Sequence, residues 1–217
     1  MESSAVKRDL RHLARARRRT IAAGLSAEQV VAAGEAIADA VFGLPVPLAR
    51  PVRVAAYESL PDEPPTGLLI ERLLAAGHEV IVPVTLDDFS LQWRRAVAGV
   101  VGDQSTVTRG PSGAGSARVA ADRWLGKDAL SSAALVITPG LTVDRHGTRL
   151  GQGGGCYDRA LRHRDPSAPV LTLLHEGEAS EVDLPRDEHD RPVDGWVSTT
   201  GTVVTVSGWP DRPAGAG

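Results

Sequence analysis

The chain has 217 residues, of which 42% are apolar and 4% aromatic, and its 24 basic and 27 acidic side chains give a net charge of −3. This composition argues against general disorder and predicts one globular domain over residues 1–207, with a core mostly of Ala, Val and Leu. The single cysteine, Cys156, excludes an internal disulfide and a cysteine-based zinc site, and no apolar run could span a bilayer, so we expect a cytoplasmic protein without membrane contacts.

The first twenty residues predict a basic helix. Their cations would be the first groups that an anionic partner meets: Lys7, Arg8, Arg11, Arg15, Arg17, Arg18 and Arg19. A second set of positions near helical spacing predicts a face that docks on the protein body, with the arginines toward solvent or a ligand: Val6, Leu10, Leu13, Arg17 and Ile21. A solvated helix face explains the same charges equally well.

From residue 26 onward the pattern predicts alternating helices and strands. Ser26 as an N-cap, with Gln29 three residues later, indicates a second helix that ends near Gly43. An apolar run at 52–57, a helical pattern that ends at Gly77, and a second apolar run then form a βαβ unit. A unit of this kind favours parallel strands joined by a right-handed crossover.

The later segments repeat this pattern and define the expected fold. Strands are expected at 91–97, 134–141 and 169–174, a helix at 157–164, and a closing segment at 189–200. We therefore predict a three-layer α/β/α fold, in which an open, mostly parallel sheet carries helices on both faces. Residues 102–116 are expected to form a flexible surface loop, and residues 208–217 a disordered tail.

A glycine-rich segment, RLGQGGGCYDRALRHR at 149–164, leads into the predicted helix. Glycine leaves backbone N–H groups unobstructed and a helix N-terminus adds partial positive charge, so the segment suits a phosphate. It lacks the Gly-Lys-Ser/Thr ending of a P-loop, and Cys156 takes the place of the third glycine of a dinucleotide fingerprint. Its position after strand 134–141 is the edge at which open α/β sheets bind ligands. On the glycines alone, a long turn without a ligand is an equal alternative.

The longer stretch PGLTVDRHGTRLGQGGGCYDRAL, at 139–161, resembles the signature of the 5-formyltetrahydrofolate cyclo-ligase family. Three further blocks occur in the family's order: KRDLR at 7–11, YESLPDEPPT at 57–66 and LPRDEHDRPVDGWVST at 184–199. The resemblance implies an enzyme that uses ATP and Mg²⁺ to convert 5-formyltetrahydrofolate to 5,10-methenyltetrahydrofolate. In this reaction the formyl oxygen is phosphorylated, and ADP and phosphate are released. We expect a monomer with no nucleic-acid partner.

The resemblance also implies roles for the matching residues. The ATP-binding positions are Lys7, Arg11, Arg149, Leu150, Gly151, Gln152, Gly153, Gly154, Gly155 and Tyr157. The folate-binding positions are Glu63, Gly153, Gly154, Cys156 and Tyr157. The catalytic positions are Arg149, Gly153, Gly155 and Asp158, and the positions associated with Mg²⁺ are Asp158 and Asp190. Hard carboxylate oxygens suit that ion, although Asp158 near a helix N-terminus and Asp190 in a turn also have ordinary structural explanations.

Two departures from the family pattern leave the activity open. Cys156 stands where the family usually has tyrosine or phenylalanine, and Gln152 where tyrosine or arginine is more usual. The alternative is therefore a diverged relative that binds ATP but lacks cyclo-ligase activity or acts on another ligand. A thiol nucleophile at Cys156 is disfavoured because no histidine partner is identifiable. A nucleic-acid-binding role is disfavoured by the few aromatic residues, the negative net charge, and the end of the basic run at Arg19.

Overall fold

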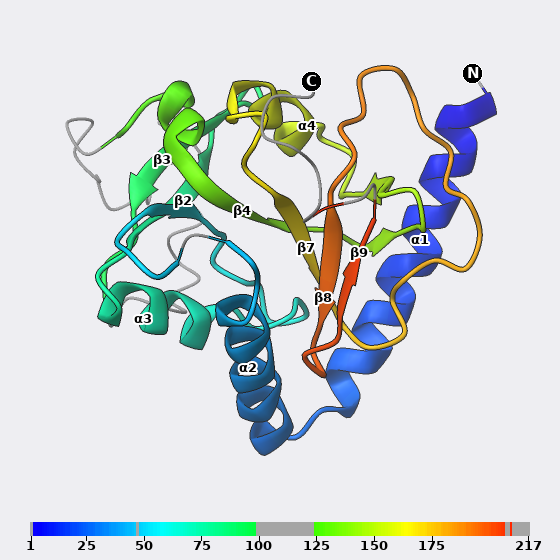
Figure 1. Ribbon diagram of the computed structural model, residues 1–217. Coiled ribbons are helices and arrows are strands. Elements are labelled where there is room, and N and C mark those ends of the chain that lie inside the picture. Colours follow the sequence, from blue (N-terminus) through cyan, green and yellow to red (C-terminus); the bar gives the residue numbers. More distant parts are fainter. Residues whose placement is uncertain (1, 47, 99–123, 207–208, 210–217) are drawn as a thin grey trace.

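The computed structural model describes residues 2–46, 48–98, 124–206 and 209. One sheet is formed by β1 (Arg53–Ala55), β2 (Glu79–Thr85), β3 (Leu91–Arg95), β4 (Ala133–Pro139), β7 (Val170–Leu174), β8 (Gly195–Ser198) and β9 (Val203–Thr205). Its strand order is β3-β2-β1-β4-β7-β8-β9. The inner strands are parallel, and the edge strands β3 and β9 are antiparallel to their neighbours (Figure 1). The predicted mostly parallel sheet is confirmed.

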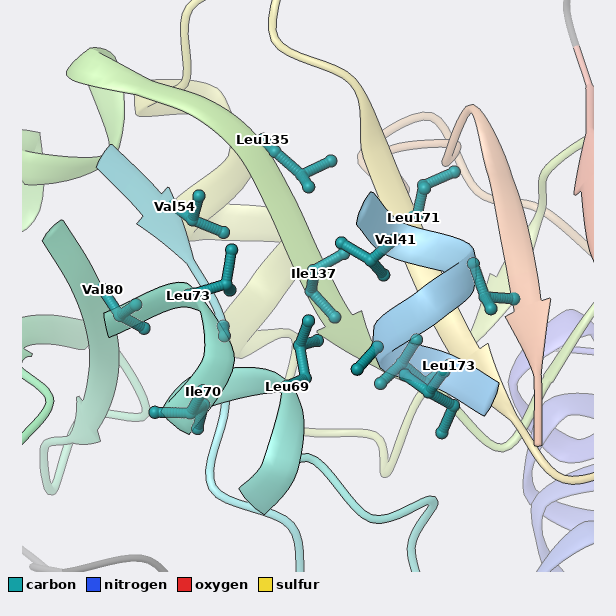
Figure 2. Close-up of a cluster of buried hydrophobic side chains, with 14 of the residues drawn as sticks. Val41, Val54, Leu69, Ile70, Leu73, Val80, Leu135, Ile137, Leu171 and Leu173 are labelled. Carbon is teal, nitrogen blue, oxygen red and sulfur yellow. The ribbon is translucent and has the colours of Figure 1, made fainter. Parts of the chain in front are cut away.

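Helices cover both faces of the sheet. One face is covered by α2 (Ala27–Phe42) and α3 (Gly67–Ala75), as Figure 2 shows for the side chains that meet there. The other face is covered by η3 (Lys127–Ser132), α4 (Cys156–Ala160) and η4 (Leu161–His163). The helix predicted at 157–164 is thus divided into α4 and η4. A separate antiparallel hairpin is formed by β5 (Thr142–Val143) and β6 (Arg149–Leu150).

The central strands are apolar on both sides because both of their faces are buried. Val54 of β1 packs against the α2–α3 side, whereas its neighbour Ala55 packs against the opposite side, and both are 0% exposed. Successive strand residues point to opposite faces, so a strand between two helical layers reads as a continuous apolar run. This arrangement explains why these strands were recognisable in the sequence.

The start of α2 confirms the predicted capping box. The Ser26 hydroxyl accepts a hydrogen bond from the Gln29 N–H at 3.2 Å, and the Gln29 side chain accepts one from the Ser26 N–H at 2.8 Å. The helix ends at Phe42, followed by Gly43 as its C-cap. Two backbone donors at the start of the helix are therefore satisfied locally.

The prediction for the first helix, α1 (Glu2–Gly24), is wrong about which face contacts the body. Val6 is 45% and Leu13 65% exposed, whereas Lys7 is 6% and Arg18 1% exposed. The helix lies along one side of the molecule (Figure 1) and contacts it through cations that have carboxylate and carbonyl partners. Polar pairing thus replaces apolar burial as the reason for docking.

Two predictions concern segments that are largely outside the described residues. The loop predicted at 102–116 lies entirely outside them. The same holds for the tail at 208–217 except Trp209, which is partly buried against the α2–α3 cluster.

Among the described residues, no helix alone is long and apolar enough to cross a membrane. Only Ser4–Ala23 and Ala27–Phe42 together reach that length and composition, and they are bent by 114°.

Candidate active site

A cavity of about 560 Å³ lies at the carboxyl ends of the parallel strands. Its walls include Thr85, which ends β2, and Pro139, which ends β4. This edge is where ligands bind in open α/β sheets. All fourteen predicted site residues line the cavity: Lys7, Arg11, Glu63, Arg149, Leu150, Gly151, Gln152, Gly153, Gly154, Gly155, Cys156, Tyr157, Asp158 and Asp190. The structure thus brings these residues together, while their individual chemical roles remain predictions.

The buried carboxylate of Asp144 holds the hairpin that leads into the glycine-rich loop. Asp144 Oδ1 accepts hydrogen bonds from the N–H groups of His146 at 2.9 Å and Thr148 at 2.8 Å. Asp144 Oδ2 accepts one from the Leu184 N–H at 2.8 Å. One side chain therefore joins the β5–β6 turn to residues 184–190, which contain Asp187 and Asp190 and are called the acidic segment below.

Asp144→Asn is expected to destabilise the fold by about 2 kcal/mol, because an amide NH₂ replaces an acceptor of backbone N–H groups. Burial disfavours the Asp144 carboxylate, but the hydrogen bonds from Leu184, Thr148 and His146 outweigh burial and lower its pKa. The resulting stabilisation is present above the unfolded-state pKa of about 3.9 and is lost as the pH falls through the lower folded-state value. Wild-type Tm should therefore fall more steeply than the Asp144→Asn Tm below about pH 5. Parallel Tm curves would contradict this account.

Two arginines of α1 hold the first part of the glycine-rich loop. Arg11 Nε donates to the Gly151 carbonyl at 3.0 Å. Arg15 donates twice to Gln152, from Nε to the side-chain oxygen at 2.7 Å and from Nη2 to the carbonyl at 2.8 Å. A Cβ atom on Gly153 would lie 3.4 Å from the Arg11 guanidinium, and its φ of +105° favours glycine. The loop conformation therefore depends on close packing against α1.

Arg149 is a buried cation that lines the cavity, with a side chain that is 4% exposed. Its Nη1 donates to the Pro139 carbonyl at 3.1 Å, and its Nη2 pairs with Asp158 Oδ1 at 3.3 Å. Its guanidinium carbon lies 5.5 Å from the centre of the Tyr157 ring. The buried Nε has no hydrogen-bond partner among the described residues. The guanidinium is thus fixed in orientation and retains a donor for a ligand oxygen.

Lys7 pairs with two carboxylates of the acidic segment. Its Nζ lies 2.7 Å from Asp187 Oδ2 and 2.5 Å from Asp190 Oδ2. Burial opposes the charge on Lys7, but hydrogen bonds to Asp187 and Asp190 outweigh burial and raise its pKa. A positive charge is therefore maintained at this end of the cavity.

The acidic segment also provides a donor set for a cation. Ligand atoms of Asp187, His189 and Asp190 lie within 4.8 Å of one another. Carboxylate oxygens fit Mg²⁺, which usually retains several waters and binds one or two protein carboxylates. Asp158, the other predicted Mg²⁺ ligand, also lines the cavity but pairs with Arg149 and accepts the Arg191 N–H at 3.2 Å. The two predicted ligands therefore have different protein partners.

Arg18 forms a buried ion pair that anchors α1 at the cavity. Its Nε and Nη2 donate to the two Glu178 oxygens at 2.8 and 2.7 Å, and Nη2 also donates to the Gly140 carbonyl at 2.5 Å. Burial opposes the Arg18 charge, but Glu178 outweighs burial and raises the Arg18 pKa. The pair fixes the position of a cavity-lining guanidinium.

Another part of the wall contains Glu63, Tyr157 and Cys156. Burial raises the pKa of Glu63, although its carboxylate accepts the Leu60 N–H at 3.0 Å. The Tyr157 hydroxyl is buried without a hydrogen-bond partner among the described residues, and burial raises its pKa. Burial also raises the pKa of the Cys156 thiol, which argues against a nucleophilic thiolate. This wall therefore offers a carboxyl and a neutral hydroxyl to a polar ligand.

Four residues that support the site were not among the predicted site residues, although two of them belong to the predicted basic helix: Arg15, Arg18, Asp187 and Glu178. Arg15 follows Arg11 by one helical turn, and Asp187 precedes Asp190 by three residues, so spacing alone could have suggested both. The Arg18–Glu178 pair joins residues 160 positions apart, for which local sequence gives no signal. These contacts become visible only in the folded chain.

The chain is similar to known proteins over most of its length. A sequence model of the 5-formyltetrahydrofolate cyclo-ligase family matches residues 3–199. The 5-formyltetrahydrofolate cyclo-ligase of Mycolicibacterium smegmatis is 31% identical over 142 residues, which cover 63% of this chain and 68% of the relative. The enzyme of the same name from Mus musculus is 24% identical over 148 residues, which cover 65% and 70%.

The fold is similar to solved structures of proteins with a related name. The NMR structure of Aquifex aeolicus 5,10-methenyltetrahydrofolate synthetase has a TM-score of 0.68 and 23% identity, with 93% of each chain covered. The 5,10-methenyltetrahydrofolate synthetase from Mycoplasma pneumoniae has a TM-score of 0.60 and 14% identity, with 93% of this chain and 100% of that chain covered. The match to residues 3–199 extends over most of the sequence, and the chain belongs to the 5-formyltetrahydrofolate cyclo-ligase family, a family of ligases.

Proposed function

We propose that the protein catalyses the ATP-dependent cyclisation of 5-formyltetrahydrofolate to 5,10-methenyltetrahydrofolate. The γ-phosphoryl group passes from ATP to the formyl oxygen, leaving ADP. The folate N10 amine then attacks the activated carbon and loses its proton, and the formyl oxygen departs with phosphate as the ring closes. The observation that carries the proposal is one cavity that combines a glycine-rich loop and fixed cations with a wall that contains Glu63 and the Tyr157 hydroxyl. Family membership supports the same reaction.

The cations and the loop would form the phosphate side of the site. Phosphoryl transfer depends mainly on positioning and on neutralising phosphoryl charge. Arg149 offers its buried Nε, Lys7 and Arg11 add positive charge, and backbone N–H groups at 153–155 add neutral donors. Asp190, with Asp158 or Asp187, would hold Mg²⁺, which when bound adds further neutralisation of phosphate charge.

The wall that contains Glu63 and Tyr157 would form the folate side. A carboxyl group can accept hydrogen bonds from pterin N–H groups, and the Tyr157 hydroxyl can donate to a ligand oxygen. Cys156 adds a small polarisable surface beside them. Burial raises the pKa of Glu63, and the carboxyl remains close to the buried Tyr157 hydroxyl on the cavity wall.

The first test is absorbance in the methenyltetrahydrofolate band with purified protein, 5-formyltetrahydrofolate, ATP and Mg²⁺. A rise is expected only when all three additions are present. ATP binding is measured separately by calorimetry. Protein that binds ATP but produces no rise would support the alternative, a diverged relative with another ligand, to which the departures at Gln152 and Cys156 point.

Asp158→Asn is expected to lower kcat by about 10- to 100-fold with little change in Tm, because it removes a carboxylate from the phosphate side of the cavity. A metal-binding role predicts that the Mg²⁺ concentration for half-maximal rate also rises. A role limited to orienting Arg149 predicts lower kcat at unchanged Mg²⁺ dependence. Asp183→Asn is a matched control, because its side chain is 56% exposed on the surface. A wild-type rate in Asp158→Asn would remove this residue from the site.

The proposal also includes a monomeric enzyme in the cytoplasm. The cytoplasmic location is supported by the single cysteine, which needs no oxidising compartment. Sedimentation at assay concentration should give the mass of one chain. A dimer mass that persists on dilution would overturn the monomer.

A further inference from the structure

Phe89 has a backbone conformation that does not suit its side chain. Its φ is +59°, and it is the one non-glycine residue with positive φ in the part of the chain that the structure describes. It lies in the turn between β2 and β3, which is closed by the hydrogen bonds Leu86 N–H to Ser90 O and Phe89 N–H to Leu86 O, both at 2.9 Å. Left-handed residues close such hairpin turns, and glycine takes these positions at the lowest cost. The turn explains the φ value but not the phenylalanine.

Core packing does not explain the ring either. Phe89 is 58% exposed and belongs to neither of the two buried clusters. A Cβ atom placed on Gly154 would lie 3.3 Å from Phe89 Cδ1 and 3.2 Å from Cys156 Sγ. The ring and the thiol therefore lie against the same loop glycine, which lines the cavity together with Cys156. The residues at the two ends of the turn, Thr85 and Leu91, line the cavity as well.

The turn is tied to the glycine-rich loop by one guanidinium group. Arg159 Nη2 donates to the Phe89 carbonyl at 2.7 Å and to the Gly154 carbonyl at 2.8 Å. The unfavourable φ of Phe89 is thus held in place by contacts with the loop. Strained residues that persist in this way are concentrated at ligand-binding sites.

We propose that the Phe89 ring forms the outer wall of the folate site and stacks on an aromatic ring of the bound folate at the cavity mouth. The inference rests on the proposed function, because that function identifies the aromatic ligand. The position along the loop favours folate over ATP. The α1 arginines contact the loop at Gly151 and Gln152, whereas Phe89 lies at its other end, beside Gly154 and Cys156. Offset or edge-to-face contacts between aromatic rings add binding energy beyond the area that they bury.

The test compares Phe89→Leu with Phe89→Tyr. Phe89→Leu keeps an apolar side chain at the strained position but removes the aromatic ring, so KM for 5-formyltetrahydrofolate should rise by about 3- to 10-fold. KM for ATP should stay within about twofold, and Phe89→Tyr should retain the wild-type KM for folate. Val97→Ala is the control, since Val97 is 54% exposed beyond the end of β3. An unchanged KM for folate in Phe89→Leu, or equal rises in both KM values, would overturn the proposal.

Two further variants separate binding from structure and from catalysis. Phe89→Gly relieves the unfavourable φ, so its Tm should rise by about 2–4 °C while its KM for folate rises as in Phe89→Leu. If Phe89 has only a structural role, Phe89→Gly should change Tm and leave KM for folate unchanged.

Phe89→Trp reports on folate binding by fluorescence in the absence of ATP. Wild type is the control for the emission of the natural tryptophans. If wild type makes no methenyl product, the proposed function fails by itself. In that case the proposed stacking is supported if 5-formyltetrahydrofolate changes the fluorescence of Phe89→Trp more than it changes the fluorescence of wild type. Equal changes in the two proteins would overturn it.

Discussion

Arg149→Lys is expected to lower kcat/KM for ring closure by about 10²–10³-fold, the usual cost of losing a preorganised donor that stabilises transition-state charge. The guanidinium reaches the Pro139 carbonyl and Asp158 at the same time and keeps its Nε available. A lysine ammonium is a single point charge and cannot maintain this set of directions. The measurement is steady-state kinetics with each substrate varied in turn, accompanied by a thermal unfolding curve.

The matched control for this prediction is Arg145→Lys. Arg145 lies in the turn of the same β5–β6 hairpin, but its side chain is 71% exposed and pairs with Asp183 on the surface. Its kcat/KM should stay within about twofold of wild type, since exposed ion pairs contribute little. A near-normal rate for Arg149→Lys would mean that Lys7 and the loop N–H groups stabilise the negative charge of the phosphate without the Arg149 guanidinium.

Arg18→Met is expected to destabilise the protein by about 3–5 kcal/mol, because it leaves the Glu178 carboxylate buried without its cation. The Glu178 side chain is 1% exposed, and its partner supplies two of its hydrogen bonds. Urea unfolding followed by circular dichroism should show a lower midpoint with an unchanged m-value.

Two variants test whether this loss comes from the uncompensated charge. Arg18→Met combined with Glu178→Leu should recover part of the stability, because apolar replacements of a whole buried pair are often neutral. Asp39→Asn breaks an exposed pair with Arg72 and should cost less than about 1 kcal/mol. A single Arg18→Met variant that is as stable as Asp39→Asn would contradict the cost assigned here to the uncompensated Glu178 charge.

Burial on both faces made the central strands predictable. Val54 and Ala55 face opposite layers, so the strand appears as an uninterrupted apolar run, and the Ser26 capping box marks a helix start by local hydrogen bonds alone. For the strands and the capping box, the physical cause lies within a few residues or within one periodic pattern. The cavity residues were instead predicted from the resemblance of four sequence blocks to the family, because no local pattern alone identifies them.

The face by which α1 docks could not be predicted in this way. Hydrophobic periodicity assumes that the buried face is apolar, but Lys7 and Arg18 are buried with carboxylates that are 160 or more positions later in the chain. Phe89 was missed for a different reason. Its positive φ is a property of the closed turn, and sequence preference at such a position favours glycine.

Helix α1 is held by polar partners that lie far along the chain, and this limits the order in which parts of the molecule can fold during synthesis. The hydrogen bonds described above between α1 and the rest of the site span between 122 and 183 positions of the chain. At about 5–20 residues per second, a ribosome releases the last of these partners on the order of ten seconds or more after the helix itself. Four of the five parallel strands, β1, β2, β4 and β7, precede the acidic segment, so this part of the sheet can assemble before Lys7 meets Asp190. The cavity is therefore expected to form late, and synthesis interrupted before Asp190 would leave a partial sheet, without β8 and β9 and without a complete binding site.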